Sequence, residues 1–177
     1  MEKYSDVIIR KLTLDDLDSL LEYLGNLSES SRKRFGPHAF DQSTLWNIFS
    51  DQTHNIGFIA VEVSSQKIIA YAIIRLGFLD HDSDRLQSYG LLLDRETDCT
   101  FAPSVADEWQ GRGIGKRMFG YILEEMKTNG IRRIILWGGV QSNNALAVNY
   151  YKRLGFQTLG QFEYSGWNYD MVFSIES

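Results

Sequence analysis

The sequence is poor in cysteine and proline. Its single cysteine, Cys99, excludes an intramolecular disulfide and is typical of a protein from a reducing compartment. Proline occurs only at positions 37 and 103, and no linker-like stretch divides the 177 residues. A chain of this length is large enough to form one hydrophobic core. We therefore expect a single domain over residues 1–177.

Long apolar runs and an excess of positive charge are also absent. No apolar stretch approaches the length needed to span a membrane. Glu2, Lys3 and Asp6 interrupt the start of the chain, where a secretory signal would be apolar. The formal net charge of -5 argues against a nucleic-acid-binding surface, which is usually basic. The sequence thus predicts a cytoplasmic protein that binds neither membranes nor nucleic acid.

Histidine is scarce as well. The three histidines, at positions 38, 54 and 81, lie far apart and show no metal-ligand spacing. They are expected in loops or at the surface, and no metal centre is predicted.

The hydrophobic pattern predicts a mixed α/β fold. Helices are expected where apolar residues recur every three or four positions, and strands where β-branched and aromatic residues cluster between turn residues. The expected helices are residues 14–24, 41–49, 115–128 and 143–154. The expected strands are residues 7–12, 56–63, 67–78, 100–105, 131–137, 156–164 and 167–175. Residues 27–40 form a polar segment, and residues 79–87 a charged loop or short helix.

The most informative stretch is residues 105–116, Val-Ala-Asp-Glu-Trp-Gln-Gly-Arg-Gly-Ile-Gly-Lys. Gly111, Gly113 and Gly115 alternate at the end of a predicted strand and just before an amphipathic helix. Glycine lets the backbone turn tightly and bring its N–H groups close to a ligand. At a helix start those groups lack intrahelical acceptors and favour an anion. The stretch therefore predicts a phosphate or pyrophosphate cradle, which the basic side chains around it fit.

Three phosphate-binding motifs use such a turn, and their spacing separates them. A P-loop needs Ser or Thr after Gly-Lys, whereas Arg117 follows Gly115-Lys116. A dinucleotide-binding loop needs Gly-x-Gly-x-x-Gly, whereas the spacing here is Gly-x-Gly-x-Gly. The third pattern, Gln-x-x-Gly-x-Gly, is matched by Gln110, Gly113 and Gly115. A strand-to-helix turn without a ligand is the alternative that the loop alone leaves open.

A second motif lies in the last predicted helix. Asn144, Ala147, Tyr151 and Gly155 recur at helical spacing, so they lie along one side of the helix, and Phe156 follows. Taken alone, this is also the pattern of a helix that packs in the core and ends at a glycine.

Together, the two motifs resemble those of the GNAT superfamily of acyl-coenzyme A-dependent N-acyltransferases. The resemblance is specific over residues 100–162, and residues 7–63 agree with the family in element order alone. It implies a twisted, largely antiparallel sheet of about seven strands, splayed at the cofactor site and flanked by about four helices. It also implies an enzyme that moves an acetyl group from acetyl-CoA to a primary amine of a small molecule or protein. The amine would attack directly in a ternary complex, without a metal.

The same resemblance assigns site residues. Pyrophosphate would lie on the N–H groups of the loop and pantetheine against the backbone of residues 102–105, with an N–H near Val105 as oxyanion donor. Tyr151 is the expected general acid toward the thiolate, because a phenol of pKa about 10 can supply the proton. The expected cofactor-binding residues are Val105, Trp109, Gln110, Gly111, Arg112, Gly113, Ile114, Gly115, Lys116, Asn144, Ala147 and Tyr151.

The general base is less clearly marked. Many family members have a glutamate near the start of the strand before the loop, where this sequence has Asp98-Cys99-Thr100. Asp98 is the candidate for that role, directly or through water, and a solvated acid at a strand end is the alternative. Cys99 has no histidine close in sequence and is expected to be a buried apolar residue. Asp107 and Glu108 are interpreted as turn residues.

The acceptor is expected to contact the segment after the first helix. Residues 31–38, Ser-Arg-Lys-Arg-Phe-Gly-Pro-His, are locally basic, which suits an anionic group on the acceptor; a solvated loop anchored by Phe35 explains the same pattern. A non-catalytic acyl-CoA-binding sensor or regulatory module is the alternative function. Aromatic residues near the C-terminus fit either a homodimer face or core strands: Phe162, Tyr164, Trp167, Tyr169 and Phe173.

Overall fold

The computed structural model describes residues 6–51 and 53–176. The chain divides into two compact units. The first unit is Met1–Ile74 with Ala102–Glu125, and the second is Arg75–Phe101 with Met126–Ser177. The strands β3 and β4 and the helix α5 each contribute residues to both units.

The first unit is built on four strands that are hydrogen-bonded in sequence order: β1 (Val7–Lys11), β2 (Asn55–Glu62), β3 (Ile68–Leu76) and the carboxyl-terminal half of β4 (Asp98–Val105). The strands β1 and β2 are antiparallel. The strands predicted at residues 56–63 and 67–78 are confirmed as β2 and β3, which are neighbours in the sheet and are connected by a short turn. Both strands contain long buried runs, as expected for a sheet that is covered on its two faces.

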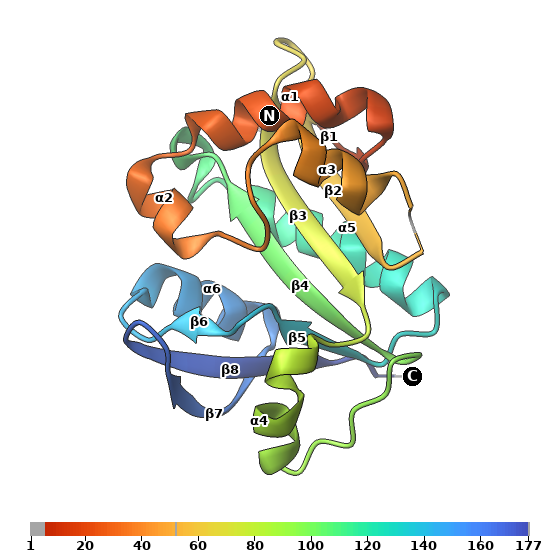
Figure 1. Ribbon diagram of the computed structural model, residues 1–177. Coiled ribbons are helices and arrows are strands. Elements are labelled where there is room, and N and C mark those ends of the chain that lie inside the picture. The colour runs from red at the N-terminus through yellow and green to blue at the C-terminus, as the bar shows by residue number, and fades with distance from the viewer. Residues whose placement is uncertain (1–5, 52, 177) are drawn as a thin grey trace. The chain divides into compact units, whose positions relative to one another are not determined.

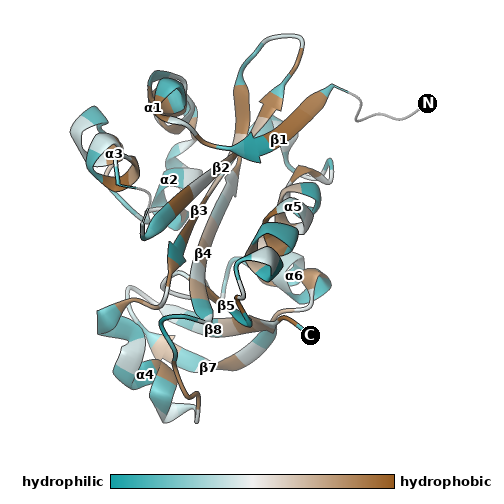
Figure 2. Cartoon of the chain, turned by 90° about the vertical axis from the view of Figure 1, so that its right-hand side faces the viewer, coloured by the Kyte–Doolittle hydropathy of each residue, from teal (hydrophilic) through white to brown (hydrophobic). Residues whose placement is uncertain are grey.

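The helices of the first unit supply that cover. They are η1 (Leu14–Asp16), α1 (Leu17–Asn26), α2 (Glu29–Arg34), α3 (Gln42–Phe49), η3 (Asp107–Trp109) and α5 (Ile114–Thr128). Figure 2 shows α1 and α3 on one side of the β1–β4 strands and α5 on the other, with hydrophobic and hydrophilic stretches in turn along α5. This is the expected arrangement for amphipathic helices that each bury one face.

Side-chain caps decide where these helices begin. Asp16 accepts hydrogen bonds from the Thr13 backbone N–H and hydroxyl, which confirms the predicted start of the first helix. Asp41 accepts from the Thr44 N–H at 2.8 Å and begins α3. The helix α2 was not predicted, because none of its residues is buried and its sequence therefore carries no apolar stripe.

The second unit holds the start of β4 and the strands β5 (Arg133–Leu136), β6 (Val140–Gln141), β7 (Gln157–Glu163) and β8 (Trp167–Ser174). The strands β4 and β5 are parallel, whereas β5, β6 and β7 each pair antiparallel with β8. The helices of this unit are η2 (Asp80–Asp82), α4 (Ser83–Ser88) and α6 (Ala145–Leu154). The helix predicted at residues 143–154 and the strands predicted at residues 156–164 and 167–175 are confirmed.

The sheet has eight strands rather than about seven. The additional strand, β6, is only two residues long and follows Gly138-Gly139, which the sequence indicated as the end of a strand. Both glycines have positive φ, and a Cβ on Gly139 would lie 2.6 Å from the Tyr169 carbonyl oxygen. A turn this tight returns the chain to β8 for one more pair of residues, which a pattern of apolar residues cannot reveal.

Charged side chains fasten α4 to β8, two elements of the second unit that Figure 1 labels. The Arg85 guanidinium donates to both carboxylate oxygens of Asp170 and forms an ion pair with Asp82 at 2.9 Å. The Tyr89 hydroxyl donates to Asp170 at 2.8 Å, and its ring packs where a Cβ on Gly160 would stand. These contacts explain why a short, polar helix has a defined place on the strands.

Candidate functional site

The glycine loop follows β4 in the first unit and has the backbone of an anion cradle. Gly111 and Gly113 adopt φ values of +72° and +81°, which L side chains rarely adopt. Both glycines are exposed, and α5 begins directly after them at the buried residue Ile114. The first N–H groups of a helix have no intrahelical acceptor. The loop thus directs a helix start toward solvent, next to the exposed side chains of Arg112 and Lys116.

Part of the loop is occupied by its own turn. The N–H groups of Trp109 and Gln110 donate to the carbonyl oxygens of Ala106 and Asp107, at 2.8 and 3.3 Å. The Arg112 guanidinium lies 4.8 Å from the centroid of the Trp109 ring, a cation–π contact. Hydrogen bonds within the turn therefore use the first two N–H groups of the predicted cradle.

The strand β4 continues past its pairing with β5. The parallel register runs from Asp98 opposite Arg133 to Phe101 opposite Leu136, while β4 itself extends to Val105. The last four residues of β4 are therefore outside that register. These are residues 102–105, where pantetheine was predicted to lie.

The register with β3 decides which backbone groups β4 offers there. Ala106 N–H donates to the Ile69 carbonyl, so alternate residues of β4 bond to β3, and Val105 directs its N–H away from β3. The Val105 carbonyl accepts from Gln110 Nε2 at 3.1 Å, and Pro103 has no N–H to offer. The edge therefore presents one donor, Val105 N–H, and one carbonyl, that of Pro103.

The α6 motif of the second unit contains the predicted helix, which begins after Asn144 rather than at residue 143. Asn144 is the N-cap, and its Oδ1 accepts from the Ala147 N–H at 3.3 Å. Gly155 ends the helix with a φ of +106°. The Tyr151 ring is buried against Phe156, with 5.4 Å between ring centroids, and burial raises the pKa of its hydroxyl. A hydroxyl of raised pKa keeps its proton at neutral pH, as an acid must.

Asp98 has a structural role in the second unit. Its carboxylate is 0% exposed and accepts from Arg133 Nε at 2.8 Å, Arg133 Nη2 at 2.9 Å and the Asp94 N–H at 2.8 Å. Arg133 also donates to the Leu92 carbonyl. The alternative of a solvated acid at a strand end is therefore wrong. The general base predicted at Asp98 is a carboxylate whose charge Arg133 already balances.

Two neighbouring predictions have clear outcomes. Cys99 is fully buried, and burial raises the pKa of its thiol, so the thiolate that a nucleophile requires is disfavoured.

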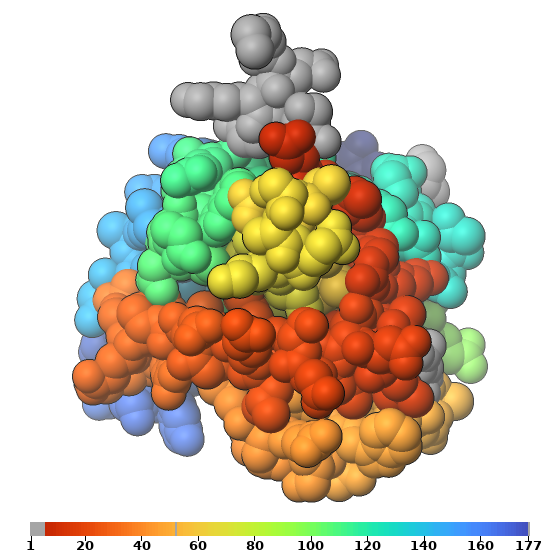
Figure 3. Space-filling model, turned by 90° about the horizontal axis from the view of Figure 1, so that it is seen from above, coloured from red at the N-terminus to blue at the C-terminus, as the bar shows by residue number. Residues whose placement is uncertain are grey.

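Asp107 is a turn residue as predicted, but it also accepts from the Ser28 N–H, the Ser28 hydroxyl and the Ser31 hydroxyl. Figure 3 shows the green surface of the glycine loop beside the orange-red surface of α2. Asp107 thus ties the loop to the segment where the acceptor is expected.

The basic residues of α2 are largely engaged within their own segment. Arg32 donates to the carbonyl oxygens of Leu27 and Gly25, and Lys33 pairs with Glu29 at 2.9 Å. Phe35 is buried, as the interpretation of an anchored loop requires. The structure therefore gives little support to this segment as an anion site.

His38 follows α2 in a loop, as predicted, but its imidazole is partly buried against β3. Its Nδ1 lies 2.8 Å from the Ala39 carbonyl oxygen and its Nε2 lies 2.9 Å from the Tyr71 hydroxyl. A carbonyl can only accept, so Nδ1 carries the hydrogen and Nε2 accepts from Tyr71. Burial lowers the pKa of His38, which favours this neutral form. Neither residue was singled out by the sequence as part of a pair, because they lie 33 positions apart.

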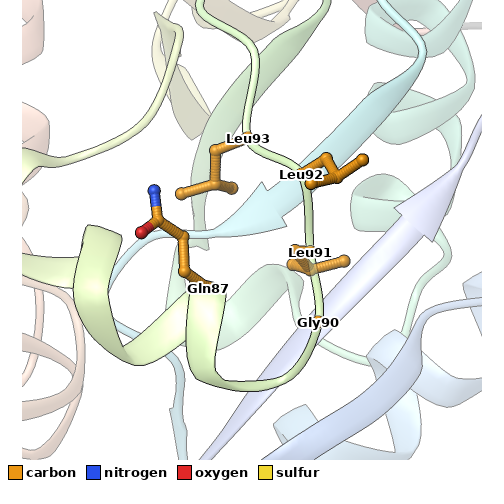
Figure 4. Close-up of a pocket in the computed structure, with 5 residues that line it drawn as sticks. All are labelled: Gln87, Gly90, Leu91, Leu92 and Leu93. Atoms are coloured by element: carbon orange, nitrogen blue, oxygen red, sulfur yellow. The ribbon is translucent and has the colours of Figure 1, made fainter.

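Pockets elsewhere carry no comparable chemistry. One of about 340 Å³ in the second unit is lined by Gln87, Gly90 and residues 91–93 (Figure 4), with Leu92 87% exposed. Another, of the same volume, lies on α3 beside Trp46. Neither is lined by a predicted site residue. Within residues 6–51 and 53–176, no group of three His, Cys, Asp or Glu side chains is placed to hold a metal. No helix in that part of the chain is long and apolar enough to cross a membrane.

The C-terminal aromatic residues do not share one exposed face. Tyr164 and Trp167 are 78% and 55% exposed at the turn between β7 and β8. Phe162 is covered by the Arg85 guanidinium, and Phe173 packs on Phe156. The homodimer stays a prediction.

Comparison with known proteins identifies the chain's relatives. A model of the acetyltransferase (GNAT) family matches residues 21–156. The [ribosomal protein bS18]-alanine N-acetyltransferase of Salmonella typhimurium is 32% identical over 76 residues, 41% of this chain and 49% of that protein. The match thus spans about half the length of this curated relative.

Solved structures show the same fold. The ribosomal-protein-S5-alanine acetyltransferase from Vibrio fischeri has a TM-score of 0.74 at 15% identity, over 97% of this chain and 94% of that one. The PaiA N-acetyltransferase from Thermoplasma acidophilum, in complex with coenzyme A, has a TM-score of 0.69 at 16% identity, over 96% and 99% of the two chains. With the glycine loop, the α6 motif and a family match over most of its length, the chain belongs to the acetyltransferase (GNAT) family.

Proposed function

We propose that the protein transfers an acetyl group from acetyl-CoA to a primary amine by direct attack in a ternary complex. The observation that carries this proposal is the loop between β4 and α5. Its two left-handed glycines expose a helix start, and it follows residues 102–105 of β4, which lie outside the register with β5; this suits a ligand with pyrophosphate at one end and an amide-bearing arm.

Each part of the donor has a proposed contact. The pyrophosphate lies on the N–H groups that begin at Gly111, with Arg112 and Lys116 balancing its charge. The pantetheine arm pairs with the backbone of residues 102–105, where the Pro103 carbonyl is available as an acceptor. Asn144 contributes its side-chain NH₂, because its oxygen caps α6. The remaining residues of the predicted set, Val105, Trp109, Gln110, Gly113, Ile114, Gly115, Ala147 and Tyr151, shape these contacts.

The reaction needs few groups from the protein. Holding the amine against the thioester is a large contribution to rate. As the amine attacks the carbonyl carbon, negative charge develops on the carbonyl oxygen, and Val105 N–H donates to it. The C–S bond then breaks, and Tyr151 gives its proton to the departing thiolate. A phenol of ordinary pKa is already protonated at neutral pH, so the proton is present before the reaction.

The sequence predicted that Asp98 removes the proton from the amine, and we propose a different acceptor for that proton. Three donors hold the Asp98 carboxylate, and the residue is 0% exposed, so it is poorly placed to meet an amine. We therefore propose that Asp98 stabilises the start of β4 and that the amine loses its proton to water.

The acceptor class includes small amines and protein amino groups. Two of the relatives are named for the acetylation of alanine on ribosomal proteins. Peptides with an N-terminal alanine therefore belong in any acceptor screen, beside small primary amines.

The test is a thiol-release assay with acetyl-CoA and such a panel, run on the wild type and on Tyr151→Phe. We expect amine-dependent release, and a fall of kcat by about 10²- to 10⁴-fold in the variant with little change in acetyl-CoA affinity. Tight acetyl-CoA binding without transfer to any amine would favour a sensor or regulatory module instead. An unchanged kcat in Tyr151→Phe would remove Tyr151 from the mechanism.

A further inference from the structure

The penultimate residue of β3, Arg75, is charged, and its Nε lacks a hydrogen-bond partner. Arg75 follows a buried apolar run, and its side chain is partly buried. Across residues 6–51 and 53–176, Arg75 Nε is the one buried side-chain nitrogen or oxygen without a hydrogen bond. Buried donors are almost always paired, and an unpaired one is costly. Arg75 therefore calls for an acceptor that the described chain does not supply.

The strand that faces Arg75 in the second unit makes no hydrogen bond to its Nε. The hydrogen bond from Gly77 N–H to the Asp98 carbonyl sets the register of β3 and β4, which places Arg75 opposite Thr100. Thr100 gives its hydroxyl hydrogen to the Gly77 carbonyl, and the Asp98 carboxylate is held by Arg133. Arg75 is thus next to groups whose hydrogen bonds are directed elsewhere.

One carboxylate feels the charge of Arg75 without bonding to it. A hydrogen bond from Arg95 lowers the pKa of Asp80, and the charge of Arg75 contributes a smaller part. Asp80 pairs with Arg95, whose guanidinium also stacks on the Phe78 ring. The charge of Arg75 thus acts on Asp80, while the hydrogen bond to that carboxylate comes from Arg95.

We propose that Arg75 binds a carboxylate or phosphate group on the amine acceptor, so that the protein prefers acceptors carrying an anion. This inference rests on the proposed function. A guanidinium offers Nε–H and Nη–H in a planar fork that matches either anion with two parallel hydrogen bonds. The anion is assigned to the acceptor because the phosphates of acetyl-CoA have their own proposed site at the glycine loop.

The activity test uses pairs of amines that differ in one anionic group. Propylamine is compared with β-alanine, and ethanolamine with phosphoethanolamine, so that the pairs separate carboxylate from phosphate. We expect the wild type to prefer the anionic member of at least one pair. Arg75→Met should lower kcat/KM for that member by about 10- to 100-fold and leave its neutral counterpart unchanged. Arg75→Lys keeps the charge but not the planar fork of the guanidinium. Its kcat/KM for the anionic amine should lie between those of the wild type and Arg75→Met.

The matched control is Arg132→Met, which removes an exposed guanidinium from the same unit. It should leave the preference between the two amines intact. An equal loss for anionic and neutral amines in Arg75→Met, or weaker acetyl-CoA binding, would overturn the assignment of the anion to the acceptor.

A second measurement judges Arg75 without any turnover. Because the Nε of Arg75 has no partner, Arg75→Met should keep or raise the Tm in chloride. Sodium acetate or phosphate at matched ionic strength should raise the Tm of the wild type more than that of the variant. An equal response of both proteins, or a Tm several degrees lower for Arg75→Met in chloride, would overturn the proposal. If no amine is acetylated, the proposed function fails, and this measurement still decides whether Arg75 binds an anion.

Discussion

The glycine loop exposes its charges to solvent, whereas the start of β4 buries a charge in an ion pair. In the loop, exposed glycines, a helix start and the side chains of Arg112 and Lys116 present positive charge to solvent. At the start of β4, the Asp98 carboxylate is fully buried and accepts three hydrogen bonds, two of them from Arg133. The first arrangement has room for an anionic ligand, whereas the second is already neutralised within the protein.

This difference separates binding from stability. A charge that solvent reaches can be given to a ligand at little cost to the fold, while a buried charge that loses its partner destabilises it. One region is the start of β4 and the other follows its end, and both contain residues that were predicted from the sequence to be functional. We therefore expect substitutions in the loop to change ligand binding and substitutions of the ion pair to change folding.

The largest effect is expected from Arg133→Met. This change leaves the Asp98 carboxylate buried without its counterion, so the free energy of unfolding should fall by about 3–5 kcal/mol. Urea denaturation measures it. Lys116→Met, a change of the same kind in the loop, should alter the free energy of unfolding by less than about 0.5 kcal/mol. Similar losses in both variants would erase the distinction between the two regions.

Asp98→Asn tests the same contrast through activity. The amide still fits between the two strands but cannot balance Arg133, so stability should fall, by about 1–3 kcal/mol, while kcat per folded molecule stays near that of the wild type. The measurement combines urea denaturation with steady-state kinetics over a range of pH. A kcat that collapses at unchanged stability would restore Asp98 as the general base.

Asp107→Ala should have a smaller effect, which combines a modest loss of stability with a change in substrate binding. Asp107 joins the loop to α2 through Ser28 and Ser31 in exposed positions, so the loss of stability should be about 1 kcal/mol or less. We expect a several-fold higher KM for the amine and an almost unchanged KM for acetyl-CoA. Steady-state kinetics with each substrate varied separately tests this, and the opposite pattern would place Asp107 on the cofactor side.

The smallest effect concerns His38 and pH. Because burial lowers its pKa in the folded state, the unfolded chain binds more protons below the ordinary pKa of 6.5, so stability should decline as the pH falls through that value. His38→Gln can still accept from the Tyr71 hydroxyl and should flatten this decline. His81→Gln, whose parent side chain is 78% exposed, is the control. Equal slopes in wild type and His38→Gln between about pH 7 and 5 would contradict the account.

The sequence predicted what depends on local pattern and missed what depends on distant partners. The glycine loop and the end of α6 at Gly155 were predictable because their geometry is set by residues within a few positions. The ion pair of Asp98 was not, since Arg133 is 35 positions away and becomes its neighbour only when β4 and β5 pair. Arg75 had a weak signal, a cation at the end of an apolar strand, but its unpaired Nε can be seen only when every neighbouring acceptor has been placed.

The most direct test of the account is a calorimetric titration of acetyl-CoA into the wild type, Gly113→Glu and Gly120→Glu. Gly113 has a φ of +81° in the loop, whereas a Cβ on Gly120 in α5 would meet open space, so the two variants add the same charge to different surfaces. We predict saturable binding to the wild type and to Gly120→Glu, and its loss in a folded Gly113→Glu. Equal binding to all three proteins, or none to the folded wild type, would contradict the assignment of the loop as the pyrophosphate site.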